Sequence, residues 1–110
     1  MVAAPLSDEE LLLRADLAGF ASVISVDDGG ARLHFTRFLK GRPRSTRFWH
    51  RLIKPRSATV RLRIRREPMM LGDWSDEGAY QVGKRIKVFL VWNDDVNAYQ
   101  TCWWNAVEWV

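Results

Sequence analysis

Residues 20–38 read FASVISVDDGGARLHFTRF, and this stretch decides how the chain folds. Apolar and polar residues alternate with a period of two on both sides of the Asp-Asp-Gly-Gly segment at 27–30. Such alternation predicts strands buried on one face, and a short glycine-rich run predicts a tight turn between them. We therefore expect strands at 20–26 and 31–38 joined in a hairpin, with the two glycines adopting positive φ.

Further strands are predicted on the C-terminal side of this hairpin. Residues 58–66 alternate strictly, so the strand has an apolar side and an arginine side formed by Arg61, Arg63 and Arg65. Residues 84–92 and 98–110 predict a terminal hairpin around a turn at 93–97, and the many glycines of 67–83 predict a long loop.

The segment before the first hairpin predicts a helix over residues 7–18. Ser7 has the properties of an N-cap, with Glu10 as its capping-box partner and Leu6 placed to pack against Leu11. Gly19 is the expected end of the helix.

Residues 45–54, between Pro43 and Pro55, fit two conformations. A short helix would gather Phe48, Trp49 and Leu52 on one side, whereas a strand would make 40–44 the turn of a second hairpin. The neighbouring strands favour the second alternative, and the sequence leaves both open.

Together these elements predict one domain, 1–110, of the α+β class and predominantly antiparallel β. We expect an N-terminal helix followed by a five- or six-stranded meander or a small, partly closed barrel. The strand entry at 80–90 is similar to those of small barrels of the oligonucleotide-binding and SH3-like kinds, but it covers 11 of 110 residues and identifies no family.

Charge is strongly segregated along the chain. Residues 29–66 contain 13 of the 17 lysines and arginines and no acidic residue, so the net charge of +4 conceals a cationic middle between acidic flanks. Such a field favours a polyanionic partner. The apolar content of 47% excludes a wholly disordered basic tail.

Alternate side chains on one strand face lie roughly 6.5–7 Å apart, which is close to the spacing of phosphates along a nucleic-acid strand. The alternative is a solvated outer face whose charges discourage edge pairing. Trp49 lies between Arg47 and Arg51 and could stack on a base or pack in the core. The candidate nucleic-acid-binding residues are Arg61, Arg63, Arg65, Arg47, Arg51, Lys54, Trp49, Arg42 and Arg44.

Four of the six tryptophans lie at positions 92–109. Core packing accounts for most of them, because a small domain needs large residues to bury enough area. In a continuous strand Trp103 and Trp104 would point to opposite faces, so Trp104 and Trp109 are candidate partner contacts, including contacts of a homodimer through the C-terminal hairpin.

Catalytic signals are weak. His34 and His50 show no metal-ligand spacing with Cys102, whose apolar surroundings indicate an inert thiol, and we expect no metal and no cofactor. The acidic pairs at 27–28 and 94–95 are expected to be turn residues. Asp73, Asp76 and Glu77 are interpreted as a solvated acidic loop or an internal counter-charge to the basic face.

The first functional hypothesis is a non-enzymatic nucleic-acid-binding module with little sequence specificity. The alternatives are a small adaptor or inhibitor, of the kind that viruses and mobile elements encode, docking on an acidic protein surface, and a small metal-independent ribonuclease using His34 or His50. Without an export signal or a long apolar segment, a soluble cytoplasmic protein is expected. DNA and RNA, single and double strands, and oligomeric states are not distinguished.

Overall fold

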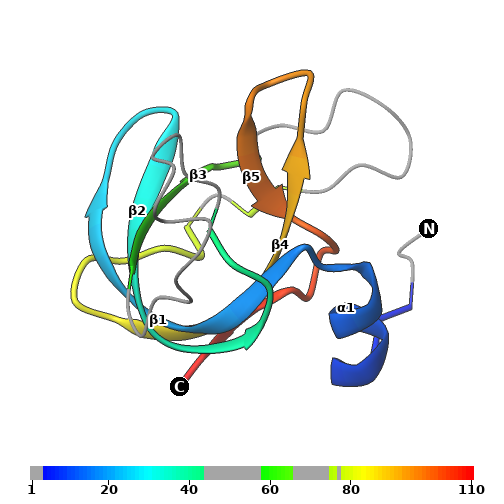
Figure 1. The fold of residues 1–110 in the computed structure, drawn as a ribbon. Coiled ribbons are helices and arrows are strands. Elements are labelled where there is room, and N and C mark those ends of the chain that lie inside the picture. The colour runs from blue at the N-terminus through cyan, green and yellow to red at the C-terminus, as the bar shows by residue number, and fades with distance from the viewer. Residues whose placement is uncertain (1–3, 44–57, 66–74, 77) are drawn as a thin grey trace.

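A computed structural model describes residues 4–43, 58–65, 75–76 and 78–110. These ranges contain one short helix and six strands (Figure 1). The elements are α1 (Asp8–Arg14), β1 (Leu17–Val26), β2 (Gly30–Lys40), β3 (Ala58–Arg63), β4 (Arg85–Asn93), β5 (Ala98–Thr101) and β6 (Val107–Trp109).

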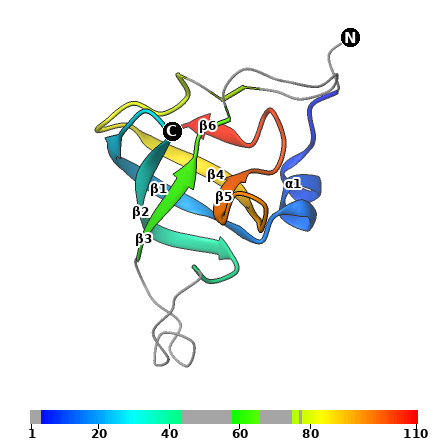
Figure 2. The same cartoon turned by 90° about the horizontal axis from the view of Figure 1, so that it is seen from above.

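The sheet closes into a barrel because β1 pairs with two neighbours, β2 and β4. The order β1-β2-β3-β5-β4 is completed by the β1–β4 pairing, and β6 extends the edge of β4 (Figure 2). The predicted small, mainly antiparallel barrel is confirmed. The meander alternative is wrong, because β5 lies between β3 and β4 and pairs with β3 in the parallel direction.

Two apolar clusters stabilise this arrangement. The barrel interior is filled by inward side chains of every barrel strand, among them Leu17, Leu33, Phe35, Leu62, Ile86, Val88 and Leu90. A second cluster joins α1 to the outside of the barrel through Leu11, Ala15, Ala18, Phe89, Cys102 and Ala106. The helix therefore covers part of the outer surface of β1 and β4.

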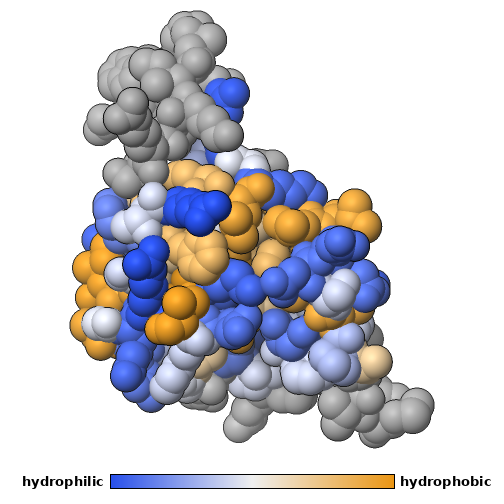
Figure 3. Space-filling model, turned by 90° about the horizontal axis from the view of Figure 1, so that it is seen from below, coloured by the Kyte–Doolittle hydropathy of each residue, from blue (hydrophilic) through white to orange (hydrophobic). Residues whose placement is uncertain are grey.

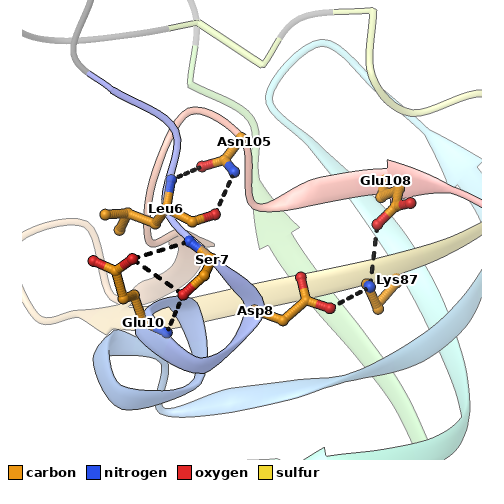
Figure 4. Close-up of polar contacts among 7 residues, drawn as sticks. All are labelled: Leu6, Ser7, Asp8, Glu10, Lys87, Asn105 and Glu108. Atoms are coloured by element: carbon orange, nitrogen blue, oxygen red, sulfur yellow. Dashed lines mark hydrogen bonds and ion pairs between the residues drawn. The ribbon is translucent and has the colours of Figure 1, made fainter.

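The start of α1 is as predicted, but its end is not. Ser7 is the N-cap, and it forms the capping box with Glu10 (Figure 4). The helix ends at Arg14 because Asp16 already pairs with β4: its N–H donates to the Leu90 carbonyl at 2.8 Å, and its carboxylate accepts from the Trp92 N–H at 2.8 Å. Residues 17–18 belong to β1, and Gly19 is a strand residue beside the Arg37 carbonyl.

The turn between β1 and β2 has a different origin from the one predicted. Neither Gly29 nor Gly30 adopts a positive φ. The turn is held instead by Asp27, whose carboxylate accepts from the Gly29 N–H at 2.9 Å and the Gly30 N–H at 2.7 Å. Gly30 is required for a steric reason, because a Cβ there would lie 2.4 Å from the Leu62 carbonyl oxygen.

The C-terminal hairpin also departs from its prediction. β5 ends at Thr101, and Trp103 and Trp104 lie in the turn before β6, so they do not occupy opposite faces of a strand. The Trp103 indole donates to the Ala4 carbonyl at 3.1 Å, and Arg14 lies 4.8 Å from its ring centroid. β3 ends at Arg63 instead of 66, and the ambiguous segment 45–54 falls outside the described residues. The helix of the described ranges, α1, has seven residues, which is too short to span a membrane.

The close approach of β2 and β3 predicts that Gly30→Ala destabilises the protein by roughly 1–3 kcal/mol, because the added methyl group meets backbone. Gly29→Ala is the matched control, since its Cβ would have only an ordinary contact, 3.9 Å from the Asp27 carboxylate. Urea unfolding of both variants measures the difference. Equal stability of the two would contradict the steric role of Gly30.

Candidate functional site

The outer face of β2 and β3 brings basic side chains together from two separate parts of the sequence. Arg32 of β2 lies directly opposite Arg61 of β3, and Arg63 follows on the same face as Arg61. All three side chains are exposed, while Val60 and Leu62 point into the barrel. The pairing of β2 with β3 therefore brings arginines that are distant in sequence into one compact cationic patch. We call it the β2–β3 patch and define it as Arg32, Arg61 and Arg63.

In the described part of the chain, one carboxylate forms an ion pair with this patch. Asp27 forms an ion pair with Arg61 at 3.1 Å, and the two side chains are 55% and 57% exposed. Hydrogen bonds from the Gly29 and Gly30 N–H groups lower the pKa of Asp27, and Arg61 and Arg32 add to this effect. An ion pair this exposed is weak and screened by salt, so it orients Arg61 more than it neutralises the patch.

Arg65 does not continue the predicted row of three arginines. Its guanidinium is half-buried and donates twice to the Thr101 carbonyl, from Nε and Nη2, both at 3.2 Å. Its backbone N–H donates to Asp76. Arg65 therefore ties the end of β3 to β5, and the exposed row is reduced to Arg61 and Arg63.

Asp76 organises this tie from a buried position. Its carboxylate accepts from the Arg65 N–H at 2.5 Å, the Tyr80 hydroxyl at 2.9 Å and the Thr101 hydroxyl at 3.2 Å. Burial raises the pKa of Asp76, and the three hydrogen bonds oppose that rise. The interpretation of Asp76 as a solvated loop residue is wrong, whereas Asp73 and Glu77 lie outside the described residues.

A groove of about 500 Å³ runs beside the patch, along β3. It extends from the turn at Gly29 to Pro43, and the tip of the β4–β5 hairpin forms its other wall with Val96 and Asn97. Arg61 and Arg63 line it together with Trp92 and Tyr99. The patch thus borders a concave surface with an aromatic component.

The aromatic part of the groove was missed by the sequence analysis, which grouped Trp92 with the packing tryptophans. Trp92 is half-buried and packs edge-to-face on Tyr99, with ring centroids 5.1 Å apart and an interplanar angle of 81°. Its indole N–H donates to Asp94 at 2.8 Å. The signal in the sequence was the spacing of Trp92 and Tyr99 across the turn at 93–97, which pairs them on adjacent strands.

Of the remaining predicted nucleic-acid-binding residues, the described ranges include Arg42. Arg42 is exposed beside Pro43, while Arg44, Arg47, Trp49, Arg51 and Lys54 fall outside the described residues. The candidate partner contacts Trp104 and Trp109 are 40% and 49% exposed. Trp109 donates to the Ala79 carbonyl at 2.7 Å, and Lys84 lies 5.6 Å from its ring centroid.

His34 and Cys102 are the other described side chains considered as candidates for chemistry. His34 shares a 3.4 Å hydrogen bond with Thr59 on the outer face. Cys102 is buried in the cluster beneath α1, and burial raises the pKa of its thiol. Among the described residues, no three His, Cys, Asp or Glu side chains converge as a metal site would require.

Comparison with protein-family models, curated proteins and solved structures found no match for the chain.

The raised pKa of Asp76 predicts a specific pH dependence of stability. A carboxyl that binds its proton more tightly when folded stabilises the protein most below its unfolded pKa, about 3.8, and this contribution is lost as the pH rises through the folded value. Relative to the Asp76→Asn variant, the wild type should lose stability as the pH increases from 3.8 toward neutrality. Denaturant titrations of both proteins across this range measure the change in stability. A wild type that gains stability relative to the variant as the pH rises would contradict the prediction.

Asp76→Ala, which leaves three donors without their acceptor, should lower the free energy of unfolding by roughly 1–3 kcal/mol at low pH.

Proposed function

We propose that this chain is a non-enzymatic nucleic-acid-binding module that contacts phosphates through the β2–β3 patch and its groove. The observation that carries the proposal is the cross-strand pair Arg32 and Arg61, continued by Arg63 along the edge of an aromatic-lined groove. Guanidinium groups donate paired hydrogen bonds that match the geometry of phosphate oxygens.

The energetics of the patch favour an anionic ligand. Like charges directly opposite each other on two strands are destabilising, and the fold places Arg32 and Arg61 in that relation. The exposed Asp27 carboxylate offsets this repulsion only weakly. A bound phosphate backbone would relieve the repulsion further and release counterions, which makes binding favourable at low salt.

The groove suits a nucleic-acid strand better than a flat acidic surface. Single-strand binding sites combine a cationic groove with aromatic faces on which bases stack. Here Arg61 and Arg63 supply the charge, and Trp92 is the half-buried aromatic side chain of the lining. The patch contains arginines and no recognition helix, so it should bind with little sequence preference.

The architecture gives independent support by analogy. Five-stranded Greek-key barrels of the oligonucleotide-binding kind hold their ligands on the face of strands 2 and 3, between the loops that join strands 1 to 2 and strands 4 to 5. The groove described above likewise lies between those two turns, which contribute Gly29 and Asn97, and of strands 2 and 3 it is lined by β3. Because one fold serves many functions, this analogy supports the proposal only at the level of architecture.

The proposal predicts that a labelled single-stranded oligonucleotide binds with an affinity that falls steeply as salt increases. The slope of log K against log salt is negative. Replacing Arg32, Arg61 and Arg63 together by Gln should reduce its magnitude by about 2, since each lost phosphate contact removes about 0.7. Fluorescence anisotropy over a salt series measures both quantities.

Two variants are controls for this experiment. Arg14→Gln removes a cation of α1 that lies over the ring of Trp103, and it should leave the slope unchanged. Arg65→Gln removes the tie to Thr101, so it should lower stability more than it lowers binding. Absence of wild-type binding at low salt, or a flat salt response, would refute the proposal. Tight association with an acidic protein under those conditions would favour the adaptor alternative.

A further inference from the structure

A second group of arginines lies on the outer face of β1, away from the groove. Phe20 of β1 is half-buried, and the guanidinium carbons of Arg37 and Arg85 each lie 5.9 Å from its ring centroid. Arg37 comes from β2, directly opposite Phe20, and Arg85 comes from β4, opposite Ser22. Three adjacent strands therefore bring two guanidinium groups to one aromatic ring.

The charges near Phe20 are compensated unequally. Lys87, which also lies opposite Phe20, is held by Asp8 at 2.8 Å and Glu108 at 3.1 Å (Figure 4). These two carboxylates raise the pKa of Lys87 and keep it charged within its own ion-pair network. In the described part of the chain, no carboxylate forms an ion pair with Arg37 or Arg85. Among the described residues near Phe20, the positive charge that lacks an ion-pair partner therefore lies on the two arginines.

A band of polar side chains connects this group with the β2–β3 patch. Arg85, Ser22, His34 and Thr59 follow one another across β4, β1, β2 and β3, because each is the register partner of the next. Figure 3 views the molecule from the side on which β1 lies in Figure 1, and strongly hydrophilic residues there border hydrophobic ones. A flexible polyanion could follow this band around the barrel without crossing the apolar cluster beneath α1.

We propose that Arg37 and Arg85 form a second phosphate-binding subsite, so that a bound single strand runs from the groove of β3 around the barrel to β1. This inference rests on the nucleic-acid-binding function proposed above. The two guanidinium carbons can be no farther apart than twice 5.9 Å, which is within the reach of one phosphate or two successive phosphates. Phe20 is a positioning residue, because its ring restricts both side chains before the ligand arrives.

The test compares the wild type with the Arg37→Gln/Arg85→Gln double variant on poly-dT oligonucleotides of about 6 and about 20 nucleotides, one near the lower end of the footprint of a small barrel and one longer than it. The long strand can reach both subsites. For this strand, the double variant should reduce the magnitude of the salt slope by about 1.4, at about 0.7 for each lost phosphate contact. The gain in affinity between the short and the long oligonucleotide should shrink in parallel. Phe20→Leu should show a smaller loss of affinity for the long strand, with both arginines still present.

Arg14→Gln is the matched control, because Arg14 also lies over an aromatic ring, on Trp103. Near-ultraviolet circular dichroism checks that each variant keeps the wild-type fold. Wild-type binding with an unchanged slope and length dependence in the double variant would overturn this inference while leaving the proposed function intact. Absence of wild-type binding would remove the proposed function and this inference together.

Discussion

The double pairing of β1 is the constraint on which the rest of the structure depends. Hydrogen bonding to β2 on one side and β4 on the other closes the sheet, and Leu17, Ala21 and Val23 of β1 are thereby buried inside. Closure removes the exposed strand edges that a small open sheet would leave. Closure also determines which side chains face outward, since residues that alternate along a strand with the core residues must point away from the interior.

Both basic groups are consequences of this closure. Arg32 and Arg61 face outward together because β2 and β3 pair in the register set by the buried leucines, Leu33 and Leu62. Arg37 and Arg85 approach Phe20 from its two sides, because β1 lies between β2 and β4, the strands that carry them. The apolar interior thus fixes the spacing of the surface charges, which repel one another and would not adopt this arrangement unaided.

Local patterns in the sequence were enough to predict much of the fold. The period of two identified the hairpin and β3, and the capping box of Ser7 and Glu10 located the start of α1. The β1–β2 turn differs from its prediction through the local hydrogen bonds of Asp27, whereas the early ends of α1 and β5 involve residues distant in sequence. The helix ends early because Asp16 bonds to β4, and β5 stops early because the chain turns back toward β6.

The candidate site was predictable in its charge but not in its shape. Alternation placed Arg61 and Arg63 outward, whereas the pairing of Arg61 with Arg32 depends on strand register, and the withdrawal of Arg65 depends on the Thr101 carbonyl. Arg85 lies outside residues 29–66, the segment without acidic residues, and is brought to Phe20 by the β1–β4 pairing. Contacts of this kind depend on how the strands pair, so the pattern of a single strand does not predict them.

The most direct test of the central claim is a nitrogen-15 NMR titration of the protein with a single-stranded oligonucleotide at low salt. The account predicts progressive shifts of backbone amides on β2, β3 and the β4–β5 turn, with Arg32, Arg61, Arg63 and Asn97 among the most affected and the residues of α1 unchanged. Shifts confined to α1 and the turn around Trp103, or an absence of shifts at saturating oligonucleotide, would contradict it.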